Sequence, residues 1–382
     1  MDSKVRKINK RIIGVDFIKI IASFFVVILH VNGYTMSSHG MVFSSTDTAI
    51  AYYSLEGIAY IAVHLFVLAG SYLMCEKEYT SLRSILRIWL TTITIAIVGL
   101  LLALILDVRF NMLAIGQSIF PISLRAYGYV SSYIFLILLS PFINITLRKM
   151  TDRQLYYISI LLIIINIVFP TIIPFISGWG ENYTMLFVTL YFISAIIHRL
   201  NCDLPMNRKI LLGGVFLWGI MTYVMVCSPY VIEYLSNHIR FLVGKEEYLY
   251  NYHNIVVLTE AIGLFLAVTN VDISIKRKIL IKAVPLAARG SLVIYLYHMH
   301  PIFKRLYPEW KAIERLYSEV WFVYLFKTLV VSIIIYILGL ILSIIINRIV
   351  NFFTNKIMDR VLCSSRINKI LSGCRITITP NL

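Results

Sequence analysis

The sequence predicts an all-α protein that crosses a membrane about ten times, with both the N- and C-termini in the cytoplasm. Of its 382 residues, 59% are hydrophobic and 14% are charged, and its mean hydropathy is +0.82. Water-soluble domains are nearer 45–50% apolar, with about a quarter of their residues charged. This composition excludes a disordered chain, a secreted disulfide scaffold and an ordinary cytosolic enzyme.

Ten apolar runs reach or approach the roughly 20 residues that a helix needs to cross a bilayer. Charged residues or turn residues flank each run. The sixth run is short, and the ninth contains charged residues. The runs cover residues 13–34, 54–74, 88–106, 127–147, 155–175, 184–198, 210–227, 253–271, 283–302 and 323–347.

The first run has the basic flank of a signal peptide, but Asp16 and Lys19 interrupt its apolar stretch. No small-residue cleavage site follows Leu29. We therefore expect this run to remain in the protein as a transmembrane helix.

The basic residues predict the orientation. Of the 35 Lys and Arg residues, 24 fall in segments that lie inside if the N-terminus is cytoplasmic, and eight fall outside. Cytoplasmic loops carry an excess of Lys and Arg, so both termini are expected inside. The net charge of +16 therefore reads as a topology signal, and we expect no nucleic-acid partner.

No soluble block, internal repeat or Gly-rich linker divides the chain. We expect one membrane domain over residues 1–382, with a transmembrane core at 12–345 and a basic cytoplasmic tail at 348–382. The cysteines fall mainly near the reducing cytoplasm, which disfavours disulfides. His298 and His300 are two residues apart and point to different helix faces, and no nucleotide-loop or metal-site motif is present, so we expect no metal.

The first span carries the densest set of costly polar groups, Asp16, Lys19 and His30. Ionisable residues inside a span are candidates for a functional site. Lys19 and His30 are eleven residues apart, which leaves them roughly 20° apart on one helix face and about 16 Å apart along the axis. Asp16 and Lys19 have the i,i+3 spacing of an ion pair, although a purely structural pair would have the same spacing.

Other ionisable residues lie within the spans, namely His64, Glu260, Arg289, His298 and His300. Each could instead satisfy a structural hydrogen bond between helices. Glu56 and Lys327 lie near span ends, where we expect their side chains to reach toward the interface.

Arg83 and Arg87 form an i,i+4 pair where the third span begins on the cytoplasmic side. Positive-inside anchoring would account for both. Arginine also binds phosphate through paired hydrogen bonds, so the pair could clamp a phosphate or pyrophosphate group.

Segments of the chain resemble, in order, the acyltransferase 3 family of integral membrane O-acyltransferases. The family has a basic residue, usually Arg, ten residues before a His in its first helix, and here these are Lys19 and His30. The resemblance covers roughly residues 12–345 and rests on the segments GVDFIKIIASFFVVILH, AVHLFVLAGSYLM, SLRSILRIW, SIFPISLRAYGYVSSYIFLILLSPFIN, YNYHNIVVLTEAIGLF and SLVIYLYHMHPIF.

Several positions depart from the family pattern. Lys19 keeps the charge but loses the planar fork of Arg, and His64 stands where Pro is common. Gly128 stands where Trp is common, which would widen a pocket. Arg87 and His298 match family positions, whereas Arg83 matches only approximately.

The resemblance implies transfer of an acyl group, typically acetyl, from cytoplasmic acetyl-CoA to a hydroxyl of a cell-surface polysaccharide or its lipid-linked precursor, in a bacterial cytoplasmic membrane. Arg83, Arg87 and Lys19 would hold the CoA phosphates, and His30 would act as general base or as acyl-carrying nucleophile. Asp16 would orient the basic residue that it faces. His298, Glu260 and His64 are the expected acceptor-binding residues.

Two alternatives remain at the level of the sequence. Buried charges also suit a transporter or flippase of a small molecule or lipid-linked saccharide, although no internal repeat of the kind common in transporters is present. A non-catalytic scaffold would not need so many costly ionisable residues.

Overall fold

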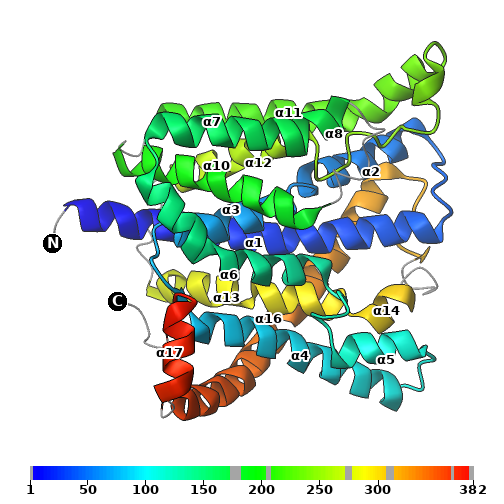
Figure 1. Cartoon of the computed structure of the whole chain (residues 1–382). Coiled ribbons are helices and arrows are strands. Elements are labelled where there is room, and N and C mark those ends of the chain that lie inside the picture. Colours follow the sequence, from blue (N-terminus) through cyan, green and yellow to red (C-terminus); the bar gives the residue numbers. More distant parts are fainter. Residues whose placement is uncertain are drawn as a thin grey trace.

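Long helices lie side by side and form a bundle in the computed structural model, which describes residues 3–172, 182–203, 208–271, 278–306, 314–362 and 365–377 (Figure 1). A π-helical turn at Ile164–Val168 joins α7 to α8. The helices are α1 (Ser3–Ser38), α2 (Thr46–Ala59), α3 (Ala62–Met74), α4 (Leu82–Ile105), α5 (Met112–Ile119), α6 (Gly128–Lys149), α7 (Asp152–Ile163), α8 (Phe169–Ile172), α10 (Tyr183–Asp203), α11 (Arg208–Ser236), α12 (Ile255–Thr269), α13 (Lys278–His298), α14 (Pro301–Leu306), α16 (Trp321–Leu362) and α17 (Ser365–Gly373).

The predicted all-α membrane fold is confirmed. Within the described residues, 8 helical segments are long and apolar enough to cross a membrane. Two further helices run along the same bundle (Figure 1): α12 is apolar but shorter, and α13 carries Lys282 and Arg289. These ten segments correspond to the ten predicted runs.

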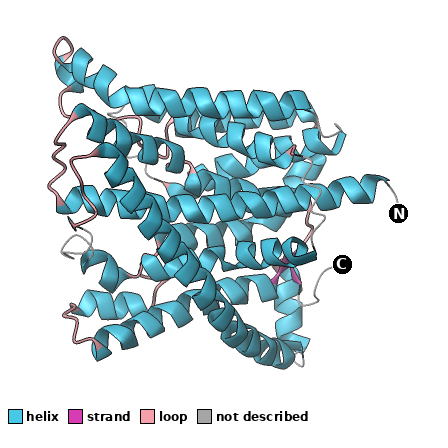
Figure 2. Cartoon of the chain, turned by 180° about the vertical axis from the view of Figure 1, so that it is seen from behind, coloured by secondary structure: helices cyan, strands magenta, loops and turns pink. Residues whose placement is uncertain are grey.

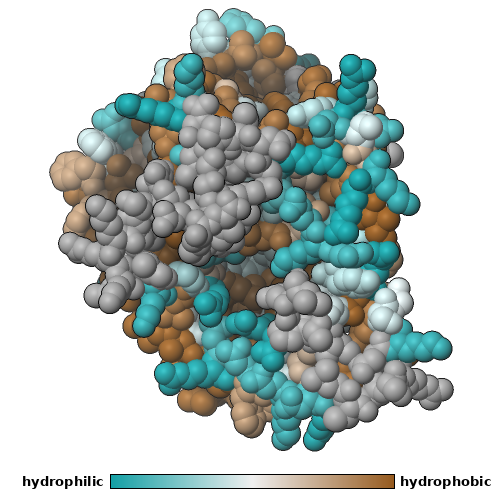
Figure 3. Space-filling model, turned by 90° about the vertical axis from the view of Figure 1, so that its left-hand side faces the viewer, coloured by the Kyte–Doolittle hydropathy of each residue, from teal (hydrophilic) through white to brown (hydrophobic). Residues whose placement is uncertain are grey.

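Both ends of the described chain lie at the same end of the bundle (Figure 1). Hydrophilic side chains gather on the face at this end (Figure 3). An even number of crossings requires the two termini to share one side, as the charge pattern predicts. We call this end the inner end, because the excess of Lys and Arg predicts that it faces the cytoplasm.

Some predicted spans differ in their limits. The predicted second span, 54–74, contains the end of α2 and all of α3, because the helix breaks at Tyr60 and Ile61. The predicted last span, 323–347, lies within the 42 residues of α16, which crosses the bundle obliquely (Figure 2). The end of the predicted fifth span, 173–175, lies outside the described residues.

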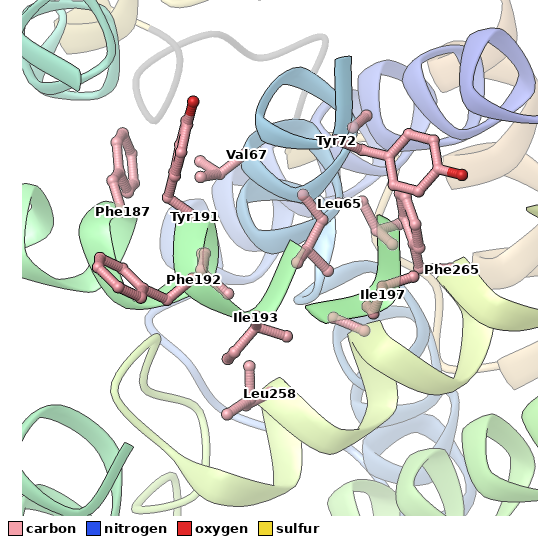
Figure 4. Packing of buried hydrophobic residues seen from close by; sticks show 14 of the residues in the cluster. Leu65, Val67, Tyr72, Phe187, Tyr191, Phe192, Ile193, Ile197, Leu258 and Phe265 are labelled. Atoms are coloured by element: carbon pink, nitrogen blue, oxygen red, sulfur yellow. The ribbon is translucent and has the colours of Figure 1, made fainter. Parts of the chain in front are cut away.

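The apolar core is centred on α3, α10 and α12, whose side chains interdigitate (Figure 4). α1 passes through the middle of the bundle and contacts α2, α3, α12, α13 and α16. Gly14 permits a close approach here, because a Cβ atom at this position would lie 3.1 Å from the Val268 carbonyl oxygen. The polar groups of α1 are thereby held inside protein rather than lipid.

The chain returns to the inner end at its C-terminus. Strand β1 (Thr80–Ser81), just before α4, pairs in parallel with β2 (Ile376–Thr377). Arg375 lies 3.8 Å from the Glu78 carboxylate. The tail therefore closes over the loop from which α4 begins.

Helices α11 and α12 approach closely because glycines face each other. A Cβ atom on Gly214 would lie 2.6 Å from the Gly263 carbonyl oxygen, and one on Gly263 would lie 2.8 Å from the Trp218 backbone nitrogen. Small residues of this kind allow close packing between membrane helices.

We expect the substitution Gly263→Val to separate α11 from α12 and to lower the free energy of unfolding by about 1–3 kcal/mol, the usual cost of overpacking. Thermal unfolding of the purified protein in detergent measures the effect. Gly219→Val on α11 is the matched control, because no atom lies within 4 Å of a Cβ there. Equal losses in the two variants would contradict the packing role.

Candidate active site

A cavity of about 520 Å³ lies among α1, α3, α4, α6, α13 and α16. It includes residues near the start of the apolar span of α1 (Ile13–Ser38) and near the start of α4, which places part of it toward the inner end of the bundle. Its polar and charged lining residues are Asp16, Lys19, Ser84, Arg87, Thr91, Arg289, Ser291 and Asn347.

The charge balance of this lining is positive. Lys19, Arg87 and Arg289 face one carboxylate, Asp16. Lys19 Nζ lies 3.3 Å from Asp16 Oδ1, which confirms the predicted i,i+3 pair. Asp16 therefore offsets the charge of Lys19, and the charges of the two arginines remain. Arginine is the residue best suited to bind phosphate through paired hydrogen bonds.

Only part of the predicted arginine clamp lines the cavity. Arg87 does, whereas Arg83, one turn nearer the start of α4, is not among the lining residues. The second arginine of the cavity is Arg289, which comes from α13. The sequence placed Arg289 inside a span without relating it to Arg87, because only the fold brings α4 beside α13.

Three tyrosines form an aromatic wall in the same cavity. Tyr129 and Tyr133 on α6 stack in parallel, with ring centroids 5.6 Å apart. Tyr129 packs edge-on against Tyr295 of α13 at 5.5 Å. Tyr295 in turn lies edge-on to His298, with ring centroids 6.3 Å apart, so the wall leads to a histidine.

His298 and His30 are in contact. His30 Nδ1 lies 3.1 Å from His298 Nε2 and 2.7 Å from the Val26 carbonyl oxygen. His298 Nδ1 is hydrogen-bonded to the Ile294 carbonyl oxygen. His298 is buried, whereas His30 is only half-buried.

These contacts assign the protons of the neutral pair. A carbonyl oxygen only accepts, so His298 carries its proton on Nδ1 and presents a lone pair on Nε2. His30 Nδ1 then donates, shared between the Val26 oxygen and His298 Nε2. The lone pair of His30 is left on Nε2, the nitrogen that can take a proton from another group.

The polar stripe of α1 faces α13 along its length. The Ser291 hydroxyl lies 3.2 Å from both the Lys19 carbonyl oxygen and the Ser23 hydroxyl. About two helical turns further along both helices, His298 meets His30. The predicted common face of Lys19 and His30 is therefore the face that packs against α13, while their axial separation leaves Lys19 in the cavity and His30 beyond it.

Two predicted acceptor-binding residues lie elsewhere. His64 is fully buried near Tyr252, with ring centroids 6.2 Å apart. Glu260 of α12 accepts a hydrogen bond from the Thr222 hydroxyl of α11 at 2.7 Å. Neither residue lines the cavity. Of the three predicted residues, His298 is the one bonded to His30.

His300 bonds to a different helix from His298, and Gly128 is not among the lining residues of the cavity. His300 Nε2 is 3.0 Å from the Ala96 carbonyl oxygen of α4, whereas His298 turns toward α1. The next residues on α6, Tyr129 and Val130, line the cavity, but Gly128 does not. The expectation that Gly128 widens a pocket has no counterpart in this cavity.

The interpretation of Glu56 as an interfacial side chain is wrong. Glu56 is only 8% exposed, and its Oε1 accepts a hydrogen bond from Asn32 Nδ2 at 2.8 Å. Asn32 also accepts from the Tyr324 hydroxyl and donates to the Tyr52 carbonyl oxygen. The hydrogen bond from Asn32 of α1 therefore holds the Glu56 carboxyl group inside the bundle. Lys327, in contrast, donates to the Arg315 carbonyl oxygen at an exposed position.

We expect Asn32→Ala to lower the free energy of unfolding by about 1–3 kcal/mol or more, because it removes one hydrogen-bond partner from Glu56, Tyr52 and Tyr324 at once. Thermal unfolding in detergent gives the change. Asn237→Ala, at an exposed position, is the control. A loss no larger than that of the control would show that the network does not stabilise the fold.

The sequence model of the acyltransferase 3 family, described as an acyltransferase domain, matches residues 12–348. Comparison with curated proteins and with solved structures gave no match. The family match spans nearly the whole membrane bundle and includes the cavity and both histidines. The chain therefore belongs to the acyltransferase 3 family and is a multi-pass membrane acyltransferase.

Proposed function

We propose that this acyltransferase moves an acetyl group from cytoplasmic acetyl-CoA to a hydroxyl of a cell-surface polysaccharide or its lipid-linked precursor, in a bacterial cytoplasmic membrane. The observation that carries the proposal is the cavity itself. It has cationic side chains, and its aromatic wall leads to the His30–His298 pair.

The cationic side chains suit the CoA phosphates. Arg87 and Arg289 provide two guanidinium groups on facing helices, and Lys19 adds a third cation. In a site partly shielded from water, such charges bind phosphate more strongly than they would in bulk solvent. Arg83, one turn before Arg87 on α4, would add charge outside the lining.

The donor must then span the distance to His30. Lys19 and His30 are about 16 Å apart along α1, a separation suited to the long pantetheine arm that joins the phosphates of CoA to its thioester. Phe66, Tyr129 and Tyr295 are the lining residues of α3, α6 and α13 that lie farthest from the inner end. The arm and the thioester can therefore lie against the tyrosine wall.

His30 Nε2 supplies the base. It takes the proton of the acceptor hydroxyl as the hydroxyl oxygen bonds to the thioester carbonyl carbon. The carbon–sulfur bond then breaks, and the CoA thiolate takes the proton from His30. His298 Nε2 accepts the hydrogen bond from His30 Nδ1 throughout, so it stabilises the imidazolium and fixes the ring, the role of the orienting group in a catalytic triad. A nucleophilic route would use the same Nε2.

The ion pair between Asp16 and Lys19 belongs to the donor end in this proposal. At 3.3 Å, Asp16 holds the Lys19 ammonium on the side of the helix that faces the cavity. Asp16 acts as a positioning residue, because its partner is far from the reacting atoms. The acceptor would approach His30 from the side that leaves this residue half-buried.

We expect His30→Ala to lower acetyl transfer by at least about 10²-fold, the usual contribution of a general base, with normal amounts of protein in the membrane. The measurements are O-acetyl content of the surface glycan and CoA release by purified protein given acetyl-CoA and glycan. His238→Ala, at an exposed position, is the control. Wild-type transfer by the His30 variant would exclude the proposed chemistry.

The transport alternative gives a different result in the same assay. A carrier would move a saccharide across vesicles without releasing CoA, and His30→Ala would alter uptake alone. CoA release that depends on the glycan identifies a transferase. Its absence from active wild-type protein would favour transport.

We expect Arg87→Ala and Arg289→Ala each to weaken CoA binding by roughly tenfold or more, because each removes charge-assisted hydrogen bonds worth about 1.5–3 kcal/mol. Calorimetry with purified protein and CoA measures the affinity. Arg153→Ala, an exposed arginine at the start of α7, is the matched control. Unchanged affinity in both cavity variants would reduce these arginines to topology signals.

A further inference from the structure

The proposed function uses the aromatic side of the cavity only as a surface for the pantetheine arm and the thioester. Phe66, Tyr129, Tyr133 and Tyr295 all line it. Phosphate binding requires none of these rings. Their arrangement, however, determines how much space remains for the acyl group beside the histidines.

The position of Tyr133 depends on Gly70 of α3. A Cβ atom at Gly70 would overlap the Tyr133 hydroxyl group, so the absence of a side chain at Gly70 lets the tip of this ring approach α3. Tyr133 in turn stacks on Tyr129, with an interplanar angle of 11°. Gly70 and Tyr133 therefore brace Tyr129 from the inner side.

Packing on the other sides holds Tyr129 equally firmly. Phe66 lies 5.9 Å from it between ring centroids, and Tyr295 lies 5.5 Å from it. Behind Tyr129, Phe187 of α10 packs edge-on at 5.5 Å and is fully buried. A chain that extended past Tyr129 would have to displace a close-packed core.

A chain of side-chain contacts links Tyr129 to the proposed site of transfer. Tyr129 touches Tyr295, which touches His298, which bonds to His30. A thioester carbonyl that reaches His30 would therefore direct its acyl chain near this wall. In this arrangement a longer chain would run into the Tyr129 ring, which lines the cavity.

We infer that Tyr129, braced by Tyr133 against Gly70, restricts the donor to CoA thioesters of short acyl chains, such as acetyl and propionyl. This inference rests on the proposed acyl-CoA function. A single methylene group in an apolar pocket changes discrimination by roughly 10–200-fold, so one ring at the end of the cavity is enough to set the chain length.

The test compares turnover of acetyl-, butyryl- and hexanoyl-CoA by wild-type protein and by Tyr129→Leu and Tyr129→Ala variants. We expect the hexanoyl-to-acetyl ratio to rise by at least tenfold in both variants. Gly70→Ala should push Tyr133 toward the cavity and lower the butyryl-to-acetyl ratio further. Because each ratio comes from one protein preparation, partial loss of folded protein does not change it.

Two matched controls separate space in the cavity from general loss of packing. Tyr191→Ala removes a fully buried ring of α10 that does not line the cavity, and Gly219→Ala adds a methyl group where no atom lies within 4 Å. Both should leave the chain-length ratios unchanged.

Equal chain-length profiles in wild-type protein and both Tyr129 variants would overturn this inference while leaving acyl transfer intact. A wild-type preference for hexanoyl-CoA would overturn it as well. Wild-type protein that turns over none of the thioesters would overturn the proposed function, and this inference with it.

Discussion

The polar stripe of α1 has to be kept out of the lipid, and much of the bundle is arranged around that need. Asp16, Lys19, Ser23 and His30 would be costly in hydrocarbon. Their partners come from within α1, from α13, which supplies Ser291 and His298, and from α16, which supplies the Tyr336 hydroxyl to Ser23. The seam between α1 and α13 therefore places the cationic cavity and the histidine pair on one line.

The same seam separates two chemical environments. At Lys19 the protein is open and positively charged, with Arg87 and Arg289 nearby. At His30 it is tighter, and the imidazole contacts a second imidazole and a carbonyl oxygen. A donor with charged phosphates at one end and a neutral thioester at the other matches this separation, which is why the proposed function assigns phosphate binding and chemistry to different parts of one helix.

Burial of a polar group does not by itself identify a site in this protein. Glu56 and Glu260 are both buried, yet each bonds to a neighbouring helix away from the cavity. His300 is buried against α4, two residues from a histidine that faces α1. What distinguishes His30 is a half-buried imidazole whose one nitrogen is engaged by fixed partners and whose other nitrogen is left to react.

The sequence by itself determined the class of fold, the approximate spans and the common face of Lys19 and His30, because hydropathy and helical periodicity are local properties. It also singled out His298, through its resemblance to a family.

The sequence did not relate Arg289 to Arg87, find the tyrosine wall, or exclude His64 and Glu260 from the cavity. It also misjudged Glu56. Those outcomes depend on which helices become neighbours, and contacts between residues far apart in the chain have no periodicity that a single sequence can reveal. Only the tertiary structure, by packing α13 against α1 and α6 against α3, decided which of the costly polar groups share a cavity.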